Sequence, residues 1–228
     1  MFLTCSRSAR AIALCVLAFV AAPARAAWYQ VEVVVFEAIS PDADGEMWAE
    51  NAGLPDASSA VELVAPAAEA IPAAAPGLIP FLALDPSWYR LDGVFRTLRT
   101  TREYRPLLHV AWQQPGEGPG SERAVHLVQL REPAAAVTTD PALYVAPDAI
   151  IDGTLQLRVG RFLHVAVDLA YLPRAAAGSP ASPGAGAGQY LRMRDRRKVL
   201  LNDLNYFDHP LFGVLVQVSR LQEKPEKQ

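Results

Sequence analysis

The pattern of hydrophobic residues predicts a chain built mainly from β-strands. The clearest segment runs from Trp28 to Ile39, where β-branched and aromatic residues follow one another almost without interruption. Glu32 and Glu37 are its only charged residues. A short apolar run of this composition is typical of a buried strand. We therefore expect residues 28–39 to form a buried opening strand.

Similar patterns recur downstream and predict an antiparallel sheet. The segments 150–159 and 161–172 flank Gly160, and this arrangement predicts a hairpin. Most links between the predicted strands have hairpin length, which favours antiparallel pairing. The other predicted strands are residues 105–114, 124–131, 190–199 and 213–220.

Residues 86–101 show the spacing of an amphipathic helix. Asp85 is suited to cap its N-terminus, and Pro86 is suited to its first position. The apolar side chains recur at intervals of three and four residues and form one stripe; they are Trp88, Leu91, Phe95 and Leu98. We expect an α+β fold, a single domain in which one main helix packs on one face of a mostly antiparallel sheet. A closed barrel is the alternative.

Two stretches rich in alanine and proline interrupt these elements. Prolines prevent a long helix between residues 55 and 80, while low charge and few aromatic residues argue against a core there. We expect a flexible insert at 51–80 and a flexible loop at 173–188, both within a domain that spans residues 27–222. Residues 41–50 and 132–147 are predicted loops, and residues 223–228 are predicted to be a solvated tail.

Residues 1–26 have the pattern of a signal peptide. Arg7 and Arg10 precede an apolar run of 12 residues, and Ala24-Arg25-Ala26 has the small-x-small cleavage pattern. An apolar run of this length is too short to span a bilayer core, which takes about 20 residues. We expect cleavage before Ala27, export, and no membrane span in the mature chain.

Export would change both the cysteine content and the charge of the chain. Both cysteines, Cys5 and Cys15, lie in the predicted signal, so the mature chain would form no disulfide. The chain has 24 acidic and 21 basic residues, and three of the basic ones fall in the same segment. A mildly acidic protein lacks the broad positive field that nucleic acid binding requires. We expect no nucleic-acid partner.

Strand parity places several polar residues on shared faces of the predicted sheet. Alternate residues of a strand point the same way, so Arg105, His109 and Gln113 share one face. His164 and Asp168 share a face of another strand. If both faces lie on one side of the sheet, they form a wet surface where arginine can clamp a carboxylate. The alternative is the ordinary solvated side of an antiparallel sheet.

The densest positive cluster of the chain lies between residues 192 and 198. Arg192, Arg194 and Arg196 would share one strand face. We interpret them as an anion site for the carboxylates of a ligand. The alternative is an edge strand that its charges protect against aggregation.

The string Tyr206-Phe207-Asp208-His209-Pro210 is a third candidate. Sugar rings pack on aromatic faces, so Tyr206 and Phe207 beside His209 are candidates for a ledge that holds a glycan. The alternative is a tight turn before the last strand, since proline forces His209 into an extended conformation and Asp208 can hydrogen-bond local backbone.

The sequence carries few signs of catalysis. Its four histidines lack the spacing of metal motifs, so we expect hydrogen-bonded sheet histidines. His164 and Asp168 lie about 13 Å apart along a strand, and no Gly-x-Ser-x-Gly string completes a triad. Glu32 and Glu37 have opposite parity, unlike the facing carboxylates of a glycosidase. We expect no catalytic residues, no metal and no cofactor.

Four strings of the chain, in order, resemble the CsiV family of periplasmic peptidoglycan-binding proteins. They are residues 28–36, 104–115, 155–171 and 205–213. The resemblance implies a non-catalytic accessory protein of the Gram-negative periplasm that supports cell-wall assembly and cell shape. Its implied partners are peptidoglycan, through glycan or stem peptide, and cell-wall synthesis proteins.

The chain departs from the family pattern at one place, and a different function stays open. Sequences of that family have Glu-Leu-His before the Tyr-Phe-Asp-His-Pro string, whereas this chain has Asp203 and Asn205 in place of the Glu and the His. The departure bears on how, or how strongly, the protein binds. The alternative function is a periplasmic scaffold that binds another protein and not the wall.

Overall fold

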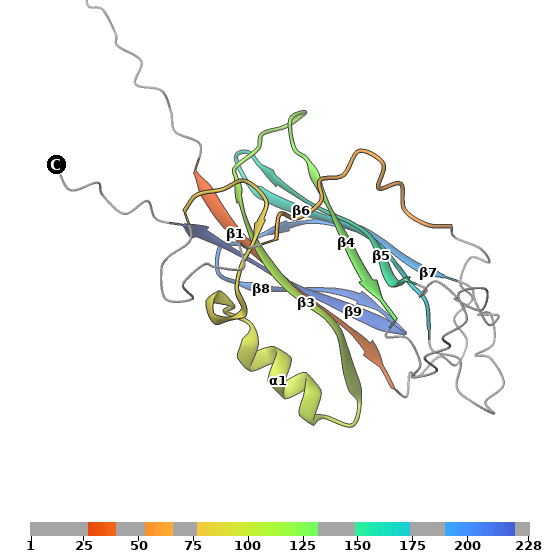
Figure 1. The fold of residues 1–228 in the computed structure, drawn as a ribbon. Coiled ribbons are helices and arrows are strands. Elements are labelled where there is room, and N and C mark those ends of the chain that lie inside the picture. The colour runs from red at the N-terminus through yellow and green to blue at the C-terminus, as the bar shows by residue number, and fades with distance from the viewer. Residues whose placement is uncertain (1–26, 40–52, 66–76, 132–148, 174–189, 222–228) are drawn as a thin grey trace, which may run out of the picture.

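In the described part of the chain, the strands form two antiparallel sheets that face each other, with one α-helix outside them (Figure 1). This computed structural model describes residues 27–39, 53–65, 77–131, 149–173 and 190–221. The predicted signal segment, the predicted loops at 41–50 and 132–147, residues 174–188 of the predicted flexible loop, and the predicted tail lie outside the described residues. The expectation of a single sheet, or of a closed barrel, is wrong. Alternation marks a strand with one apolar face, but it does not say which sheet the strand joins.

Strand β1 (Trp28–Ala38) lies at the centre of the five-stranded sheet, which explains its continuous apolar sequence. Val33 and Val35 pack toward the other sheet, whereas Val34 and Phe36 pack toward the helix. Both faces of the strand are therefore buried, as the sequence predicted. The order of the sheet is β2 (Leu82–Ala83), β3 (Tyr104–Pro115), β1, β9 (Phe212–Leu221) and β8 (Leu204–His209).

The four-stranded sheet follows the sequence predictions to within two residues at each end. Its order is β4 (Ala124–Leu130), β5 (Ala149–Val159), β6 (Leu163–Tyr171) and β7 (Leu191–Val199). The predicted hairpin across Gly160 joins β5 to β6. Along β5 and β6, buried and partly exposed residues alternate, so one face of this sheet lies in the core and the other faces outward.

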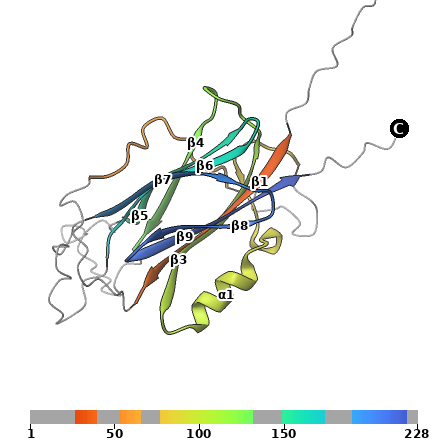
Figure 2. The same cartoon turned by 180° about the vertical axis from the view of Figure 1, so that it is seen from behind.

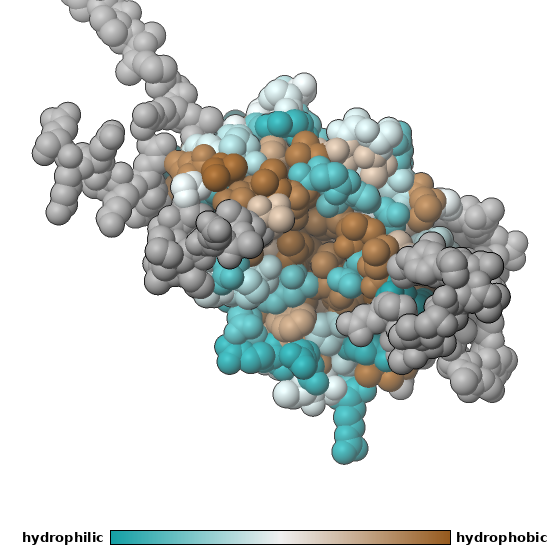
Figure 3. All heavy atoms as spheres, in the orientation of Figure 1, coloured by the Kyte–Doolittle hydropathy of each residue, from teal (hydrophilic) through white to brown (hydrophobic). Residues whose placement is uncertain are grey.

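The core lies between the two sheets. Val33 and Trp112 of the five-stranded sheet belong to the same buried cluster as Leu155 and Val167 of the four-stranded sheet. Figure 3 shows hydrophobic residues in a band across the middle of the molecule and hydrophilic residues over the helix. The helix covers the side of the five-stranded sheet that faces away from the other sheet, as Figures 1 and 2 both show.

The predicted helix is shorter than expected and divided in two. A 3-10 helix covers Pro86–Trp88, and the α-helix α1 covers Asp92–Thr100. The predicted cap is confirmed for the 3-10 helix, where Asp85 Oδ1 accepts a hydrogen bond of 2.9 Å from the N–H of Ser87. The helix packs on one sheet face as expected: Phe95 and Leu98 of α1 contact the cluster formed by Val34, Phe36, Leu91 and Leu215.

A buried carboxylate explains the break between the two helical pieces. The N–H groups of Arg90 and Leu91 donate to Glu32 of β1 at 2.7 and 2.8 Å. These two donors point at a side chain on the sheet, so they are unavailable to carbonyl groups of a preceding helical turn. The sequence spacing from Trp88 to Leu98 does not reveal this interruption.

Strand β8 was not predicted from the sequence. Residues 204–209 pair with β9 from Leu204↔Gln217 to His209↔Phe212, and the predicted turn contracts to Pro210 and Leu211. Asn and Asp are poor strand formers, and both occur in this segment. The pairing with β9 overrides that local preference.

Part of the predicted flexible insert lies against the sheets. The N–H of Val61 donates to Ala124 O at 2.8 Å, and the N–H of Val64 donates to Phe81 O at 2.9 Å. For residues 53–65 the expectation of an excursion from the domain is therefore wrong, while residues 66–76 lie outside the described part of the chain. Backbone hydrogen bonds to an adjacent strand require no apolar sequence pattern.

Candidate functional site

The outer face of the four-stranded sheet gathers five of the residues predicted for binding. Strands β6 and β7 are antiparallel neighbours, with Asp168 opposite Arg194 and Ala166 opposite Arg196. The residues that alternate with these on β6, among them Val167, are buried in the core. The five residues therefore point outward together; they are His164, Asp168, Arg192, Arg194 and Arg196.

The three arginines of β7 are engaged to different extents. Arg192 Nε and Nη2 donate to the two carboxylate oxygens of Asp168 at 2.6 and 2.8 Å. This bidentate bond raises the pKa of Arg192 above its usual value. Arg194 Nε lies 3.8 Å from the same carboxylate, and its side chain is 81% exposed. Arg196 is exposed and makes no ion pair with the residues that the structure describes. Arg194 and Arg196 are therefore the arginines available to an incoming anion.

Two further cations extend this surface. Lys198 and Arg158 lie on either side of His164 in the strand register, on β7 and β5. Lys198 Nζ lies 3.7 Å from the centroid of the Phe162 ring, and Arg158 Nε lies 3.7 Å from a carboxylate oxygen of Glu122. We call this surface the basic face and define it by Arg158, His164, Arg194, Arg196 and Lys198. Arg158 was not among the residues predicted for binding, although the register of the hairpin across Gly160 places it beside His164.

His109 lies elsewhere and is buried. Its Nε2 lies 2.8 Å from Glu32 Oε1, and its side chain is 7% exposed. The imidazole packs between the rings of Tyr89 and Phe95, with centroid distances of 4.5 and 4.6 Å. The expectation that His109 belongs to a wet surface is wrong, because α1 and the preceding turn cover its face of β3.

Arg105 and His109 lie on opposite faces of β3. The pairing between β1 and β3 shifts register between Val35 and Phe36, where Pro106 lies opposite Phe36. Arg105 therefore points toward the end of the sandwich, where its Nε donates to the carboxylate of Glu37. Parity alone placed the two residues on one face, and the irregularity at the proline reverses that result.

Glu37 is held from both sheets. The hydroxyl of Tyr171, on β6, donates to the carboxylate oxygen that Arg105 does not bind. Burial and this hydrogen bond raise the pKa of Tyr171 far above its ordinary value. These three residues line a hollow of about 220 Å³ between the ends of the sheets, together with Arg131. The cluster joins the two sheets at this end.

Gln113 is also removed from the proposed surface. It is 1% exposed and lies opposite Leu82 of β2. Its Nε2 donates to the carbonyl of Gly77. Its expected place on a solvated face is wrong, because the segment that contains β2 lies over this part of β3.

Tyr206 and Phe207 do not form a shared ledge. They are consecutive residues of β8 and therefore point to opposite faces. Phe207 is fully buried in the core, whereas Tyr206 is 43% exposed on the outer side. The His209 ring packs at a tilt against Phe212, with 4.9 Å between the centroids, and its Nδ1 accepts a hydrogen bond from the N–H of Leu211 at 3.2 Å. His209 therefore stabilises the turn. The predicted turn before the last strand is confirmed, but Asp208 accepts a hydrogen bond from the Tyr206 hydroxyl and not from local backbone.

The described residues contain little that resembles a metal or glycosidase site. Among them, no group of three His, Cys, Asp or Glu residues is placed to hold a metal ion. Glu32 and Glu37 face opposite sides of β1, as their parity predicted, and both are almost fully buried. None of the described helices is long and apolar enough to cross a membrane.

The chain matches a protein-family model. Neither the curated proteins nor the solved structures gave a match to this chain. A family model described as "Peptidoglycan-binding protein, CsiV" matches residues 8–221, which is nearly the whole chain. The chain therefore belongs to the CsiV family of peptidoglycan-binding proteins.

Proposed function

We propose that this protein binds peptidoglycan in the periplasm without cleaving it, and that it supports cell-wall assembly and cell shape as an accessory protein. The family supports the ligand. The observation that carries the placement of the site is the exposed row of cations on β7, formed by Arg194, Arg196 and Lys198. Alternate residues of a strand lie about 7 Å apart, so the row presents regularly spaced positive charges.

The chemistry of this row suits the carboxylates of peptidoglycan stem peptides. Guanidinium groups bind carboxylates through charge-assisted and often bidentate hydrogen bonds. Arg192 already shows this geometry with Asp168 inside the protein. Arg194 and Arg196, which lack a close partner of that kind among the described residues, would bind a ligand carboxylate in the same way. Because these groups are exposed, salt would weaken the binding.

The buried carboxylates support a binding function without cleavage. Hydrolysis of a glycosidic bond needs two carboxyl groups that flank the substrate in one cleft. Glu32 is occupied by His109 and by backbone N–H groups beneath the helix, and Glu37 is occupied by Arg105 and Tyr171. We therefore expect the purified protein to release no soluble fragments from sacculi.

Co-sedimentation with purified sacculi tests this proposal. The test variant is Arg194→Glu/Arg196→Glu, and the matched control is Arg90→Glu/Arg96→Glu, which makes the same charge change at two exposed residues beside and on α1. Each exposed charge contact is worth up to about 1 kcal/mol, and reversal makes it repulsive, so we expect the test variant to bind at least about tenfold more weakly. The control variant should pellet like the wild type.

Two outcomes would contradict the proposal. Equal loss in both variants would mean that net charge, and not the basic face, controls sedimentation. A wild type that stays in the supernatant at both low and moderate salt would refute direct wall binding. The periplasmic protein scaffold, which binds another protein and not the wall, would then replace it.

A further inference from the structure

A second surface, on the outer side of the five-stranded sheet, has the features of a sugar-binding site. Three aromatic rings lie in a row across β3, β1 and β8. Tyr104 contacts Phe36 edge to face at 5.2 Å between centroids, and Tyr206 stacks on Phe36 at 6.0 Å with 16° between the rings. Tyr104 and Tyr206 are 36% and 43% exposed, while Phe36 between them is buried. We call Tyr104, Phe36 and Tyr206 the aromatic row.

The backbone beneath the row is shaped to hold these rings. Gly213 lies opposite Phe36 in the register of β1 and β9. A Cβ atom at this position would lie 2.5 Å from the Phe36 ring and 2.6 Å from the Tyr206 ring. Only glycine therefore lets both rings lie directly on the strand. Contact with the backbone fixes the rings before any ligand arrives, and a site ordered in advance loses less entropy on binding.

A polar group accompanies the exposed rings. The Tyr206 hydroxyl donates to Asp208 Oδ1 at 2.6 Å, which holds the ring in one orientation. Burial and this hydrogen bond raise the pKa of Tyr206, so the phenol stays neutral. Asp208 keeps a second carboxylate oxygen that can accept a hydrogen bond from a sugar hydroxyl. An aromatic face beside a fixed hydrogen-bond acceptor suits a sugar ring, which has one apolar face and a rim of hydroxyl groups.

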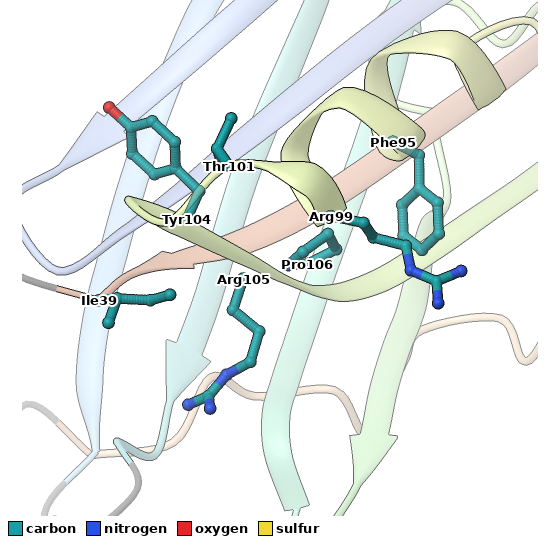
Figure 4. Close-up of a pocket in the computed structure, with 7 residues that line it drawn as sticks. All are labelled: Ile39, Phe95, Arg99, Thr101, Tyr104, Arg105 and Pro106. Atoms are coloured by element: carbon teal, nitrogen blue, oxygen red, sulfur yellow. The ribbon is translucent and has the colours of Figure 1, made fainter.

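A hollow lies beside one end of the row. It has a volume of about 330 Å³ and lies between the end of α1 and the start of β3, where Arg99, Thr101 and Tyr104 line it. Figure 4 shows that Tyr104 and Arg105 point to opposite sides of β3 at this place. The hollow offers polar groups next to Tyr104, where a second sugar of a chain would extend from the row.

We propose that the aromatic row is a binding site for the β-1,4-linked N-acetylhexosamine backbone of the glycan strand. The row lies on the outer side of the five-stranded sheet, and the basic face lies on the outer side of the other sheet. The inference rests on the proposed function in that the wall supplies the sugar. The aromatic row and the basic face take different ligands on different surfaces, so either proposal can fail without the other.

Binding of a peptide-free sugar tests the proposal. The probe is the β-1,4-linked tetrasaccharide of N-acetylglucosamine, titrated into the full chain and followed by calorimetry. We expect the wild type to bind it, and Tyr104→Ala/Tyr206→Ala to bind at least about tenfold more weakly, because two exposed stacking faces are lost. Tyr206→Phe keeps the ring and should retain most of the binding. Arg194→Glu/Arg196→Glu, on the other surface, should bind the tetrasaccharide like the wild type.

A purely structural role for the rings predicts a different result. If the rings serve only to cover Gly213, then Tyr104→Ala alone, which leaves the Phe36 and Tyr206 rings in place over Gly213, has no effect on sugar binding. If the wild type binds intact sacculi but not the tetrasaccharide, the proposal for the aromatic row is refuted and the proposal for the basic face is unaffected. If the wild type binds neither the tetrasaccharide nor intact sacculi, both proposals are refuted. If the tyrosine variants change the sedimentation coefficient but not the affinity for the sugar, the sugar site is refuted. The aromatic row would then be a contact with a second copy of the chain.

Discussion

The buried carboxylate of Glu32 is predicted to be a main attachment of the helical segment to the sheet. Glu32 is 1% exposed and accepts hydrogen bonds from the N–H groups of Arg90 and Leu91 and contacts His109 Nε2, at 2.7 to 2.8 Å. The substitution Glu32→Gln keeps the size of the side chain but replaces one accepting oxygen with an amide that donates. At least one backbone N–H then faces a donor in a buried site.

The expected loss of stability follows from these contacts. Hydrogen bonds to a charged group contribute about 1.5–3 kcal/mol each, and a buried donor left without a partner costs about 1–3 kcal/mol. Glu32→Gln weakens several such bonds and orphans one donor, so we expect the free energy of unfolding to fall by about 3–5 kcal/mol. In urea, with a slope of about 2–3 kcal/mol per molar, the midpoint should fall by roughly 1–2.5 M.

Urea unfolding at pH 7, followed by tryptophan fluorescence, measures this loss; the buried Trp112 is one of the four tryptophans of the chain. The control is Glu103→Gln, the same change at an exposed residue, which should stay within about 0.5 kcal/mol of the wild type. A Glu32→Gln midpoint equal to that of the control would refute the argument. It would mean that the helical segment is held by the apolar contacts of Phe95 and Leu98 alone.

Two further predictions concern the four-stranded sheet. His126 forms hydrogen bonds to Glu62 at 2.5 Å and to Asp152 at 2.9 Å. Burial alone would lower the pKa of His126, but these hydrogen bonds and the two carboxylate charges raise it. The stabilisation from this pairing is therefore complete below the unfolded pKa of about 6.5 and is lost as the pH rises through the higher folded pKa. Chemical denaturation should therefore show a larger difference between wild type and His126→Gln at pH 6 than at pH 9, and equal differences would contradict the pairing. Gly153 has a φ of +151°, and a Cβ atom there would overlap the backbone of β6, so Gly153→Ala should destabilise the protein by about 2–4 kcal/mol. The control is Gly93→Ala in α1, where the new Cβ meets nothing within 4 Å; it should stabilise the helix by about 0.5–1 kcal/mol. The urea midpoint should be lowest for Gly153→Ala, intermediate for the wild type and highest for Gly93→Ala, and any other order would contradict the prediction.

Strand positions were predictable here because burial leaves a direct mark on the sequence. The near-continuous apolar run of β1 follows from its central place in the sheet, and the alternation in β6 follows from one open face. Strand β8 left no such mark. It lies at the edge of the sheet, and only one of its residues is buried. Its place is set by pairing with β9, and a local sequence pattern does not report such a pairing.

The candidate site was predictable only where strands stay regular. On β6 and β7 the parity rule holds, and it places His164, Asp168 and the arginines on one outward face. On β3 the rule fails at Pro106, because the irregular pairing there turns Arg105 away from His109. The rule also cannot say what covers a face, so it took His109 for an exposed residue when the helix packs against it.

The strands that carry the two proposed surfaces contact each other at one edge of the sandwich. Arg197 of β7 donates from Nη1 to the carbonyl of Tyr206 on β8 at 2.7 Å, and its guanidinium lies 4.5 Å from the centroid of the Phe207 ring. This contact joins the strand that carries the exposed arginines to the strand that carries the exposed tyrosine. Since the two sites use different side chains on different faces, their contributions to wall binding should be independent, and losses in binding free energy from the arginine and tyrosine variants should add in the combined variant. A combined loss well below the sum would show instead that one group of side chains acts through the other, and the contact made by Arg197 is the place where such coupling would arise.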